Sequence, residues 1–280
     1  MPIPPAVPFT GLAGLKFLDR TYDRQFGLFS SSPDIEREVD YFLDKAADVR
    51  SVDDLMGDRR LLRVAIGAFG LDDDIDKGAF IRKVLADGTV DQRSFANRLV
   101  EPAYREMSAV LGFGDVGGYL FQESTRQKIA DDFKARQFEL SVGEQDVDLR
   151  LAMNFRREAV RIVGEGGSDN TIWLKLLGSQ PLRSVIESAL SLPSSFATID
   201  LDKQIEIITE RADRFLGSDG PNAFNDAEVM GQFVDRFLLN SQVANGFVSD
   251  NTPGLTALTV LQSAGVGTGA STGLFTSNFI

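Results

Sequence analysis

LMGDRRL at residues 55–61 begins the stretch that decides the fold, because the apolar residues after it keep helical spacing. Asp58 precedes the predicted helix, and its carboxylate can accept hydrogen bonds from the free N–H groups of the first turn. Gly57 is predicted to adopt the positive φ that ends a preceding helix. One face of the helix carries four apolar residues at positions i, i+3, i+7 and i+10, which are Leu61, Val64, Ala68 and Leu71.

The stretch that begins with LLGSQPL at residues 176–182 repeats this unit 121 positions later, and six residues between Leu176 and Leu192 are identical at that constant offset. Gly178 and Ser179 take the places of Gly57 and Asp58, so the same turn and the same capping role are predicted there. A second match follows in the same order, because DIDK at 74–77 is answered by DLDK at 200–203. The sequence therefore predicts an all-α fold in which two related helical halves, the product of an internal duplication, pack into one compact multi-helix body.

The organisation of the rest of the chain follows from this repeat. We predict a proline-containing N-terminal segment at 1–33, a first helical half at 34–145, a second half at 146–240 and an uncharged Gly/Ser/Thr-rich C-terminal tail at 241–280. The segment Leu12–Phe29 is apolar but interrupted by Gly14 and Gly27. Ala159–Val163 could form a short strand, although its neighbours fit the helical period better. Further helices are expected over 124–140 and 201–216, and others beginning at Asp34, at Asp74 or Asp76, at Asp146 and at Asn225.

The C-terminal stretch differs in composition from everything before it. From Asn251 to Ile280 there is not one charged residue, and isolated apolar residues alternate with glycine, serine and threonine. Two interpretations stay open for this tail. It is either mobile, or it orders against a partner or against a groove of the same protein.

The chain of 280 residues contains no cysteine and no histidine. Disulfides, thiolate nucleophiles and thiolate metal sites are therefore excluded. A Ser-His-Asp triad and an imidazole-ligated zinc are excluded as well. The absence of both residue types favours a non-enzymatic protein. The one tryptophan, Trp173, is expected in the core, and the excess of 21 phenylalanines over four tyrosines favours dry helix packing.

The formal net charge of −12 argues against nucleic acid and anionic membranes as partners, because both repel an acidic surface. Other proteins are the expected partners. No apolar run approaches the ~20 residues that span a bilayer, so no membrane insertion is expected. The N-terminus lacks the basic and apolar regions of a secretory signal. We therefore expect a cytoplasmic protein, or a flagellum-associated one if it is exported without a cleavable signal.

Three motifs suggest chemistry, but each has a simpler structural explanation. Gly112–Gly117 matches G-x-G-x-x-G, yet the preceding residues predict a helix instead of the strand that a dinucleotide site requires. The acidic run at 72–76 resembles a calcium loop, but lysine stands at both positions where such a loop needs glycine and glutamate. Gly164–Asp169 lacks the lysine of a phosphate-binding loop and is expected to join two helices.

Spacing alone does not single out a carboxylate pair for acid–base work. No catalytic, cofactor-binding or metal-binding residue is predicted, and no cofactor.

A series of short blocks, in order, carries a family resemblance over roughly residues 35–240. They are VDYF at 39–42, VRSVDDL at 49–55, GDRRL at 57–61, AFGL at 68–71, RKVL at 82–85, SFANRL at 94–99, LAMNFR at 151–156, ALSLP at 189–193 and DKQ at 202–204. The chain resembles a bacterial family with a domain-of-unknown-function label. The resemblance implies an all-helical fold. Genes of this family often lie among flagellar genes, so its members are commonly described as flagellar proteins.

Three functional hypotheses follow. The first is a non-enzymatic protein that takes part in flagellar assembly or structure through protein–protein contacts. The second is an exported axial or basal-body component of the flagellum, whose termini order on assembly. The third is an enzyme that uses carboxylate and lysine chemistry, as lyases and isomerases can. The sequence leaves the partner and the oligomeric state open.

Overall fold

The computed structural model describes residues 3–245, and every regular element within this range is helical. The predicted all-α fold is thereby confirmed. The 3₁₀ turns are η1 (Ala46–Asp48), η2 (Asp72–Asp74), η3 (Ala96–Arg98), η4 (Ser194–Thr198) and η5 (Gly217–Asn225). The α-helices are α1 (Gly11–Ser30), α2 (Pro33–Lys45), α3 (Val52–Gly57), α4 (Arg59–Gly67), α5 (Gly78–Asp87), α6 (Pro102–Leu111), α7 (Phe113–Val116), α8 (Glu123–Gly143), α9 (Val147–Gly164), α10 (Asp169–Gly178), α11 (Gln180–Ala189), α12 (Leu201–Leu216) and α13 (Ala227–Ala244).

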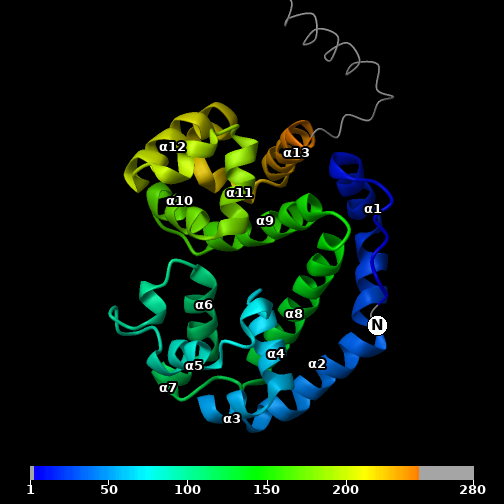
Figure 1. The fold of residues 1–280 in the computed structure, drawn as a ribbon, viewed down its shortest axis with the longest axis vertical. Coiled ribbons are helices and arrows are strands. Elements are labelled where there is room, and N and C mark those ends of the chain that lie inside the picture. Colours follow the sequence, from blue (N-terminus) through cyan, green and yellow to red (C-terminus); the bar gives the residue numbers. More distant parts are fainter. Residues whose placement is uncertain (1–2, 246–280) are drawn as a thin grey trace, which may run out of the picture.

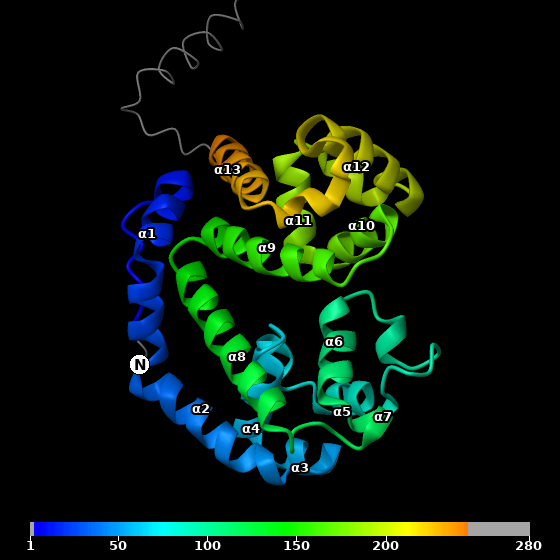
Figure 2. The same cartoon turned by 180° about the vertical axis from the view of Figure 1, so that it is seen from behind.

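Two long helices, α8 and α9, connect the two parts of the body (Figure 1). Helix α8 contacts α1, α2 and α4, whereas α9 contacts α10, α11 and α13. The opposite view shows α5, α6 and α7 grouped together (Figure 2), and each of them contacts the other two. Because α8 also packs against α9, one hydrophobic core runs through both parts.

The two copies of the sequence repeat break their helices in the same way. Asp58 separates α3 from α4, and Ser179 separates α10 from α11; each is a single extended residue, with φ/ψ of −117°/104° and −93°/120°. The predicted positive φ at Gly57 and Gly178 is wrong, because each glycine is the last residue of its helix and neither has a positive φ. One extended residue after the glycine is enough to redirect the chain. The Asp58 carboxylate accepts hydrogen bonds from the backbone N–H groups of Arg60 and Leu61, while Ser179 makes no side-chain cap.

This difference between the two junctions leads to a stability prediction. Asp58→Ala is expected to lower the free energy of unfolding by about 1 kcal/mol, because the first turn of α4 loses its cap. The Asp58 carboxylate also accepts a hydrogen bond from the Tyr41 hydroxyl at 2.6 Å, which adds to the loss. Ser179→Ala is the matched control, since it removes no cap. Urea unfolding measures both, and equal losses would contradict the capping argument.

Several predicted boundaries shift. Helix α1 runs through Gly14 and Gly27 without interruption. A Cβ at Gly14 would lie 2.2 Å from the Phe9 carbonyl oxygen, so glycine lets the preceding segment fold back along α1. Helix α13 extends to Ala244, so the first residues of the predicted tail are helical. The rest of the tail, from residue 246, lies outside the described residues. Helix starts also differ from prediction, with N-caps at Ser32 in place of Asp34, at Lys77 in place of Asp74 or Asp76, and at Asp226 in place of Asn225.

Other predicted elements agree closely with the structure. Helix α12 has the predicted bounds of 201–216, and the Asp146 side chain caps α9 by accepting from Leu149 N–H. Ala159–Val163 is helical, as its neighbours indicated. Trp173 is fully buried, which confirms its place in the core. In the second half, Phe155 and Phe233 stack with ring centroids 5.4 Å apart, and Phe224 meets Phe233 edge-on at 4.9 Å.

Candidate functional site

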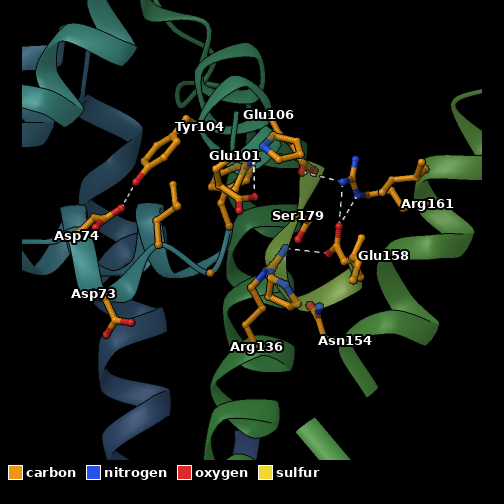
Figure 3. A pocket seen from close by; sticks show the side chains of 18 residues that line it. Asp73, Asp74, Glu101, Tyr104, Glu106, Arg136, Asn154, Glu158, Arg161 and Ser179 are labelled. Carbon is orange, nitrogen blue, oxygen red and sulfur yellow. Dashed lines mark hydrogen bonds and ion pairs between the residues drawn. The ribbon is translucent and has the colours of Figure 1, made fainter. Parts of the chain in front are cut away.

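A cavity of about 380 Å³ lies between the first and second parts of the body. Its walls come from the turn after α4, the start of α6, the middle of α8, the inner face of α9 and the start of α11. Figure 3 shows that the labelled side chains in this cavity are mostly charged, and that several point toward one another. The chemistry of this cavity therefore depends on how its charged side chains are paired.

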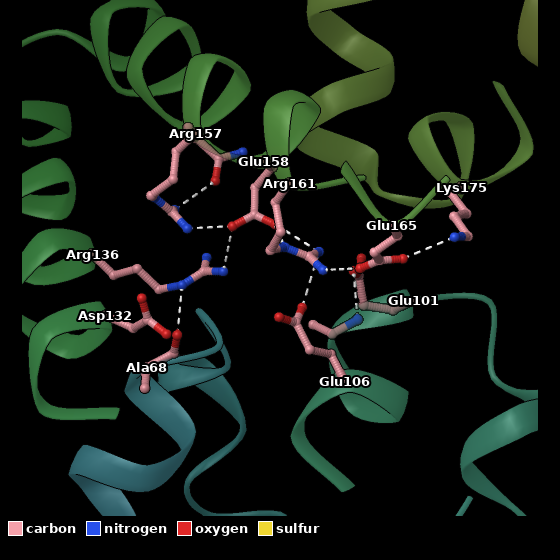
Figure 4. A network of polar contacts seen from close by, with 12 residues as sticks. Ala68, Glu101, Glu106, Asp132, Arg136, Arg157, Glu158, Arg161, Glu165 and Lys175 are labelled. Carbon is pink, nitrogen blue, oxygen red and sulfur yellow. Dashed lines mark hydrogen bonds and ion pairs between the residues drawn. The ribbon is translucent and has the colours of Figure 1, made fainter. Parts of the chain in front are cut away.

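Glu158 of α9 is at the centre of a network of arginines and glutamates (Figure 4). Its carboxylate accepts from Arg136 Nη2 at 2.8 Å, from Arg161 Nε at 2.9 Å and from Arg157. Arg157 also makes a bidentate pair with Glu139 of α8, with both N–O distances at 2.9 Å. The Glu158 side chain is only 8% exposed, so these partners replace nearly all of its hydration.

The same network reaches the neighbouring elements. Arg136 Nε donates to the Ala68 carbonyl oxygen at 2.8 Å, which ties α8 to the end of α4. Arg161 lies 3.0 Å from Glu106 of α6 and 2.5 Å from Glu165. The Arg136 and Arg161 contacts therefore join α4, α6, α8 and α9 at the point where the two parts of the body meet.

Burial and pairing act in opposite directions on the pKa values. Burial alone would raise the pKa of Glu158, but Arg136, Arg157 and Arg161 hold it below its usual value. Burial lowers the pKa of Arg136, and the neighbouring Arg157 charge lowers it further. For Glu106, burial outweighs the attraction of Arg161, so its pKa is raised. Glu158 is thus a fixed anion whose role is to bind arginines.

Tyr104 and Asp74 form a separate hydrogen-bonded pair in another wall of the cavity. The Tyr104 hydroxyl donates to the Asp74 carboxylate, and Lys77 Nζ lies 2.5 Å from the same group. Burial would raise the pKa of Asp74, but its hydrogen bonds with Lys77 and Tyr104 lower it. Burial and the Asp74 hydrogen bond together raise the pKa of Tyr104. Tyr104 is therefore held protonated and serves as a donor to η2.

Glu101 is the exception within the cavity. Its carboxylate accepts only a long hydrogen bond, 3.4 Å, from Ala103 N–H at the start of α6. No lysine or arginine among the described residues makes an ion pair with it. Burial raises its pKa above the usual value for glutamate. Asp73 also lines this cavity without a printed ion pair, but it is exposed to solvent, whereas Glu101 is half-buried.

A family described as "Protein of unknown function (DUF1217)" matches residues 68–226, which is more than half of the chain. The chain belongs to the DUF1217 family. A crystal structure of a protein from Agrobacterium tumefaciens, determined by a structural genomics consortium, is similar with a TM-score of 0.71 and 28% identity over 88% of this chain and 100% of that chain. No curated protein matches the sequence.

The DUF1217 match begins at Ala68, whose carbonyl binds Arg136, and ends at Asp226, which caps α13. It therefore contains the whole Arg–Glu network and the cavity. The similarity to the Agrobacterium protein covers more of the chain than the family match does. The DUF1217 region thus coincides with the elements that the network holds together.

The motifs singled out in the sequence take structural roles in this DUF1217 chain. Gly112 and Gly117 flank α7 in left-handed conformations, so they form a turn between helices. The acidic run at 72–74 is the 3₁₀ turn η2, and the described residues contain no cluster of carboxylates that could hold a metal ion. Gly164–Asp169 joins α9 to α10 as expected, and the Ser168 side chain caps α10. Among these motifs, only the acidic run contributes residues to the cavity, namely Asp73 and Asp74.

Sequence reasoning missed the Arg–Glu network, although a signal for it was present. Glu158 lies three residues after Phe155 and four before Ile162, both of which are buried. Arg136 likewise lies three residues after the buried Phe133. A charged residue on the buried stripe of a helix has to find a partner or pay a large desolvation penalty. Which residues meet across α8 and α9 depends on helix packing, and the spacing does not give that.

Glu101 provides a pH test of the cavity. Its raised pKa means that the folded state binds a proton more tightly than the unfolded state, so stability is lost as pH rises from the usual glutamate pKa through the raised one. Glu101→Gln is therefore expected to increase the free energy of unfolding at pH 7 and to leave it nearly unchanged at pH 4. Urea unfolding at both pH values measures this. A variant that is equally stabilised at both would show that charge is not the cause.

Proposed function

We propose that this chain is a non-enzymatic protein that acts in flagellar assembly or structure through contacts with other proteins. The observation that carries the proposal is the internal pairing of the arginines in the network. Arg136, Arg157 and Arg161 are each bound to glutamates, so the network holds four helices together and leaves none of these three guanidinium groups free for a substrate. Binding of an anionic substrate there would need such a group to be unoccupied. The flagellar context rests on the family resemblance.

Exposed apolar residues support a role in protein contacts. Four lie on or beside the short elements around α5, α6 and α7, namely Val90, Val100, Val116 and Phe121. Val90 is 82% exposed and Val100 is 85% exposed. Val90 N–H donates to Asp115, the residue before Val116, so this pair lies together. Exposed apolar groups that share one end of a body are typical of a protein-binding surface.

Genetics provides the test. Deleting the gene is expected to reduce flagellation and motility, and the unchanged gene should restore both. Val90→Asp with Val116→Asp should fail to restore them while the protein remains folded. Val160→Asp, at a 44% exposed position on α9, is the control and should restore them. Normal flagellation, motility and filament export in the deletion strain would disprove the proposal.

An exported component of the flagellum is the second candidate, favoured by the lack of cysteine and by the uncharged residues 251–280. Axial flagellar proteins resemble this chain in both respects. In that case the protein would be found in purified basal bodies or in the culture medium. Detection only in the cytosol would rule against export.

We also propose that the two parts arose by internal duplication. In both, a helix ends at glycine, one extended residue follows, and a second helix, a 3₁₀ turn and a third helix come next. The first and third helices contact each other in both sets, because α3 contacts α5 and α10 contacts α12. Superposing residues 55–86 on 176–212 tests the idea, and paired helices that run in different directions would contradict it.

A further inference from the structure

A groove of about 570 Å³ lies between α11 and the last turns of α13, at the opposite end of α11 from the cavity. Figure 1 shows these two helices side by side where α13 ends. Serine, asparagine and apolar side chains form most of its walls, and Glu187 is the only charged residue among them. The groove therefore suits an uncharged occupant.

The floor of the groove is held rigid by side chains of α13. Asn240 Nδ2 donates to the Ser188 carbonyl at 2.7 Å and to Ser191 Oγ at 3.2 Å. Arg236 Nε donates to the Ala189 carbonyl at 2.6 Å. Ser191, with φ of 51°, is the one non-glycine residue of the described chain in the left-handed region. A strained residue fixed by its neighbours is frequent at binding sites, and a fixed groove binds at a lower entropy cost.

Two features of the groove lack a partner. Glu187 Oε1 is buried and has no hydrogen-bond partner among the described residues. A buried acceptor without a donor costs about 1–3 kcal/mol, so a donor is expected there. Arg183 already supplies a nearby positive charge, so an uncharged N–H or O–H group would complete the site. Val243, which also lines the groove, is 70% exposed.

The chain itself provides a segment of matching chemistry. Ala244 lines the groove, and the sequence continues from there toward residues 255–266, LTALTVLQSAGV. These residues carry no charge, and they combine leucine and valine with threonine and serine hydroxyl donors. The ten residues from 245 to 254 can span up to about 33 Å, whereas α11 is about 15 Å long. The segment can therefore reach every part of the groove.

We propose that residues 255–266 of the same chain occupy the groove between α11 and α13. Their leucines cover Val243 and Leu192, and a backbone N–H or a threonine hydroxyl donates to Glu187. A tether of this length keeps the segment at an effective concentration near the millimolar range, which favours the chain's own segment over a second copy. This inference does not depend on the flagellar proposal. It implies that a partner for this face has to displace the segment.

Crosslinking in the full chain tests the inference, and the absence of native cysteine removes any background. Ser184→Cys places a thiol in the groove, and Ser263→Cys places one in the segment. A short bismaleimide should join them within one chain. The control pairs Ser263→Cys with Ser124→Cys, at the distant start of α8. We expect at least about tenfold more intrachain product from the groove pair, because docking raises the local concentration.

Leu258→Asp with Leu261→Asp, added to the groove pair, should reduce the yield to the control level. Both positions lie outside the described residues, and circular dichroism should show that the helical body is unchanged. Equal yields from the groove pair and the control pair would overturn the proposal. A product that joins two chains would overturn it as well, because a second copy would then be the occupant.

Discussion

Glu158→Ala is expected to lower the free energy of unfolding by about 3 to 5 kcal/mol, the usual loss when one member of a buried ion pair is removed. Arg157 keeps Glu139 and Arg161 keeps Glu106 after the change, but Arg136 loses its only carboxylate within ion-pair distance among the described residues. A buried guanidinium without an anion causes most of the loss. Urea unfolding, followed by the fluorescence of Trp173, measures it.

Two further variants separate pairing from packing. Glu210→Ala removes an exposed pair with Arg214 and should cost less than about 1 kcal/mol. Arg136→Met combined with Glu158→Leu should recover much of the loss, because apolar side chains of similar size can replace a buried ion pair. A double variant as unstable as Glu158→Ala alone would show that the unpaired arginine is not the cause. The lowered pKa of Glu158 adds a pH signature, since its contribution is lost as pH falls through that pKa.

Phe233→Ala is expected to cost about 3 to 5 kcal/mol, because it opens a cavity in a fully buried aromatic cluster. The Phe233 ring contacts Phe155, Phe215 and Phe224, which come from α9, α12 and η5. Removing it therefore loosens the packing of α13 on three other elements. Urea unfolding gives the size of the loss.

Phe121→Ala is the matched control, because the same substitution is made at a 55% exposed side chain. Its effect should stay within about 0.5 kcal/mol. Trp173 meets Phe224 edge-on at 6.1 Å, so its emission should change in Phe233→Ala and not in Phe121→Ala. Similar losses in both variants would mean that the aromatic cluster does not dominate the second part of the core.

Local patterns in the sequence predicted much of this fold. The spacing of Leu61 and Val64, and the capping residues Asp58 and Asp146, agree with the helices that form. Positions that depend on tertiary contacts were harder to predict. A Cβ added at Gly178 would lie 3.4 Å from the Val100 carbonyl oxygen, so this glycine is in close contact with another part of the chain. The matching positions of Gly57 and Gly178 suggested a positive φ, which neither glycine has.

The candidate site was less accessible to sequence reasoning than the fold. The pairs that define it join residues far apart in the chain, such as Ala68 with Arg136 and Glu106 with Arg161. In a chain with 41 acidic residues, no spacing rule selects Glu101 as a half-buried carboxylate without an ion pair in the cavity. A buried charge on an apolar stripe, as at Glu158, was the only local indication, and it points to a residue without naming its partner.

Helix α8 determines how the two parts of the molecule unfold. It packs against α1, α2 and α4 in the first part of the body and against α9 in the second, so it has neighbours from both sequence halves. A helix shared in this way cannot lose contacts on one flank and keep its position on the other. Unfolding is therefore expected to be all-or-none across residues 11–244, with no stable half-molecule as an intermediate. The two parts of the body therefore share a single folding transition.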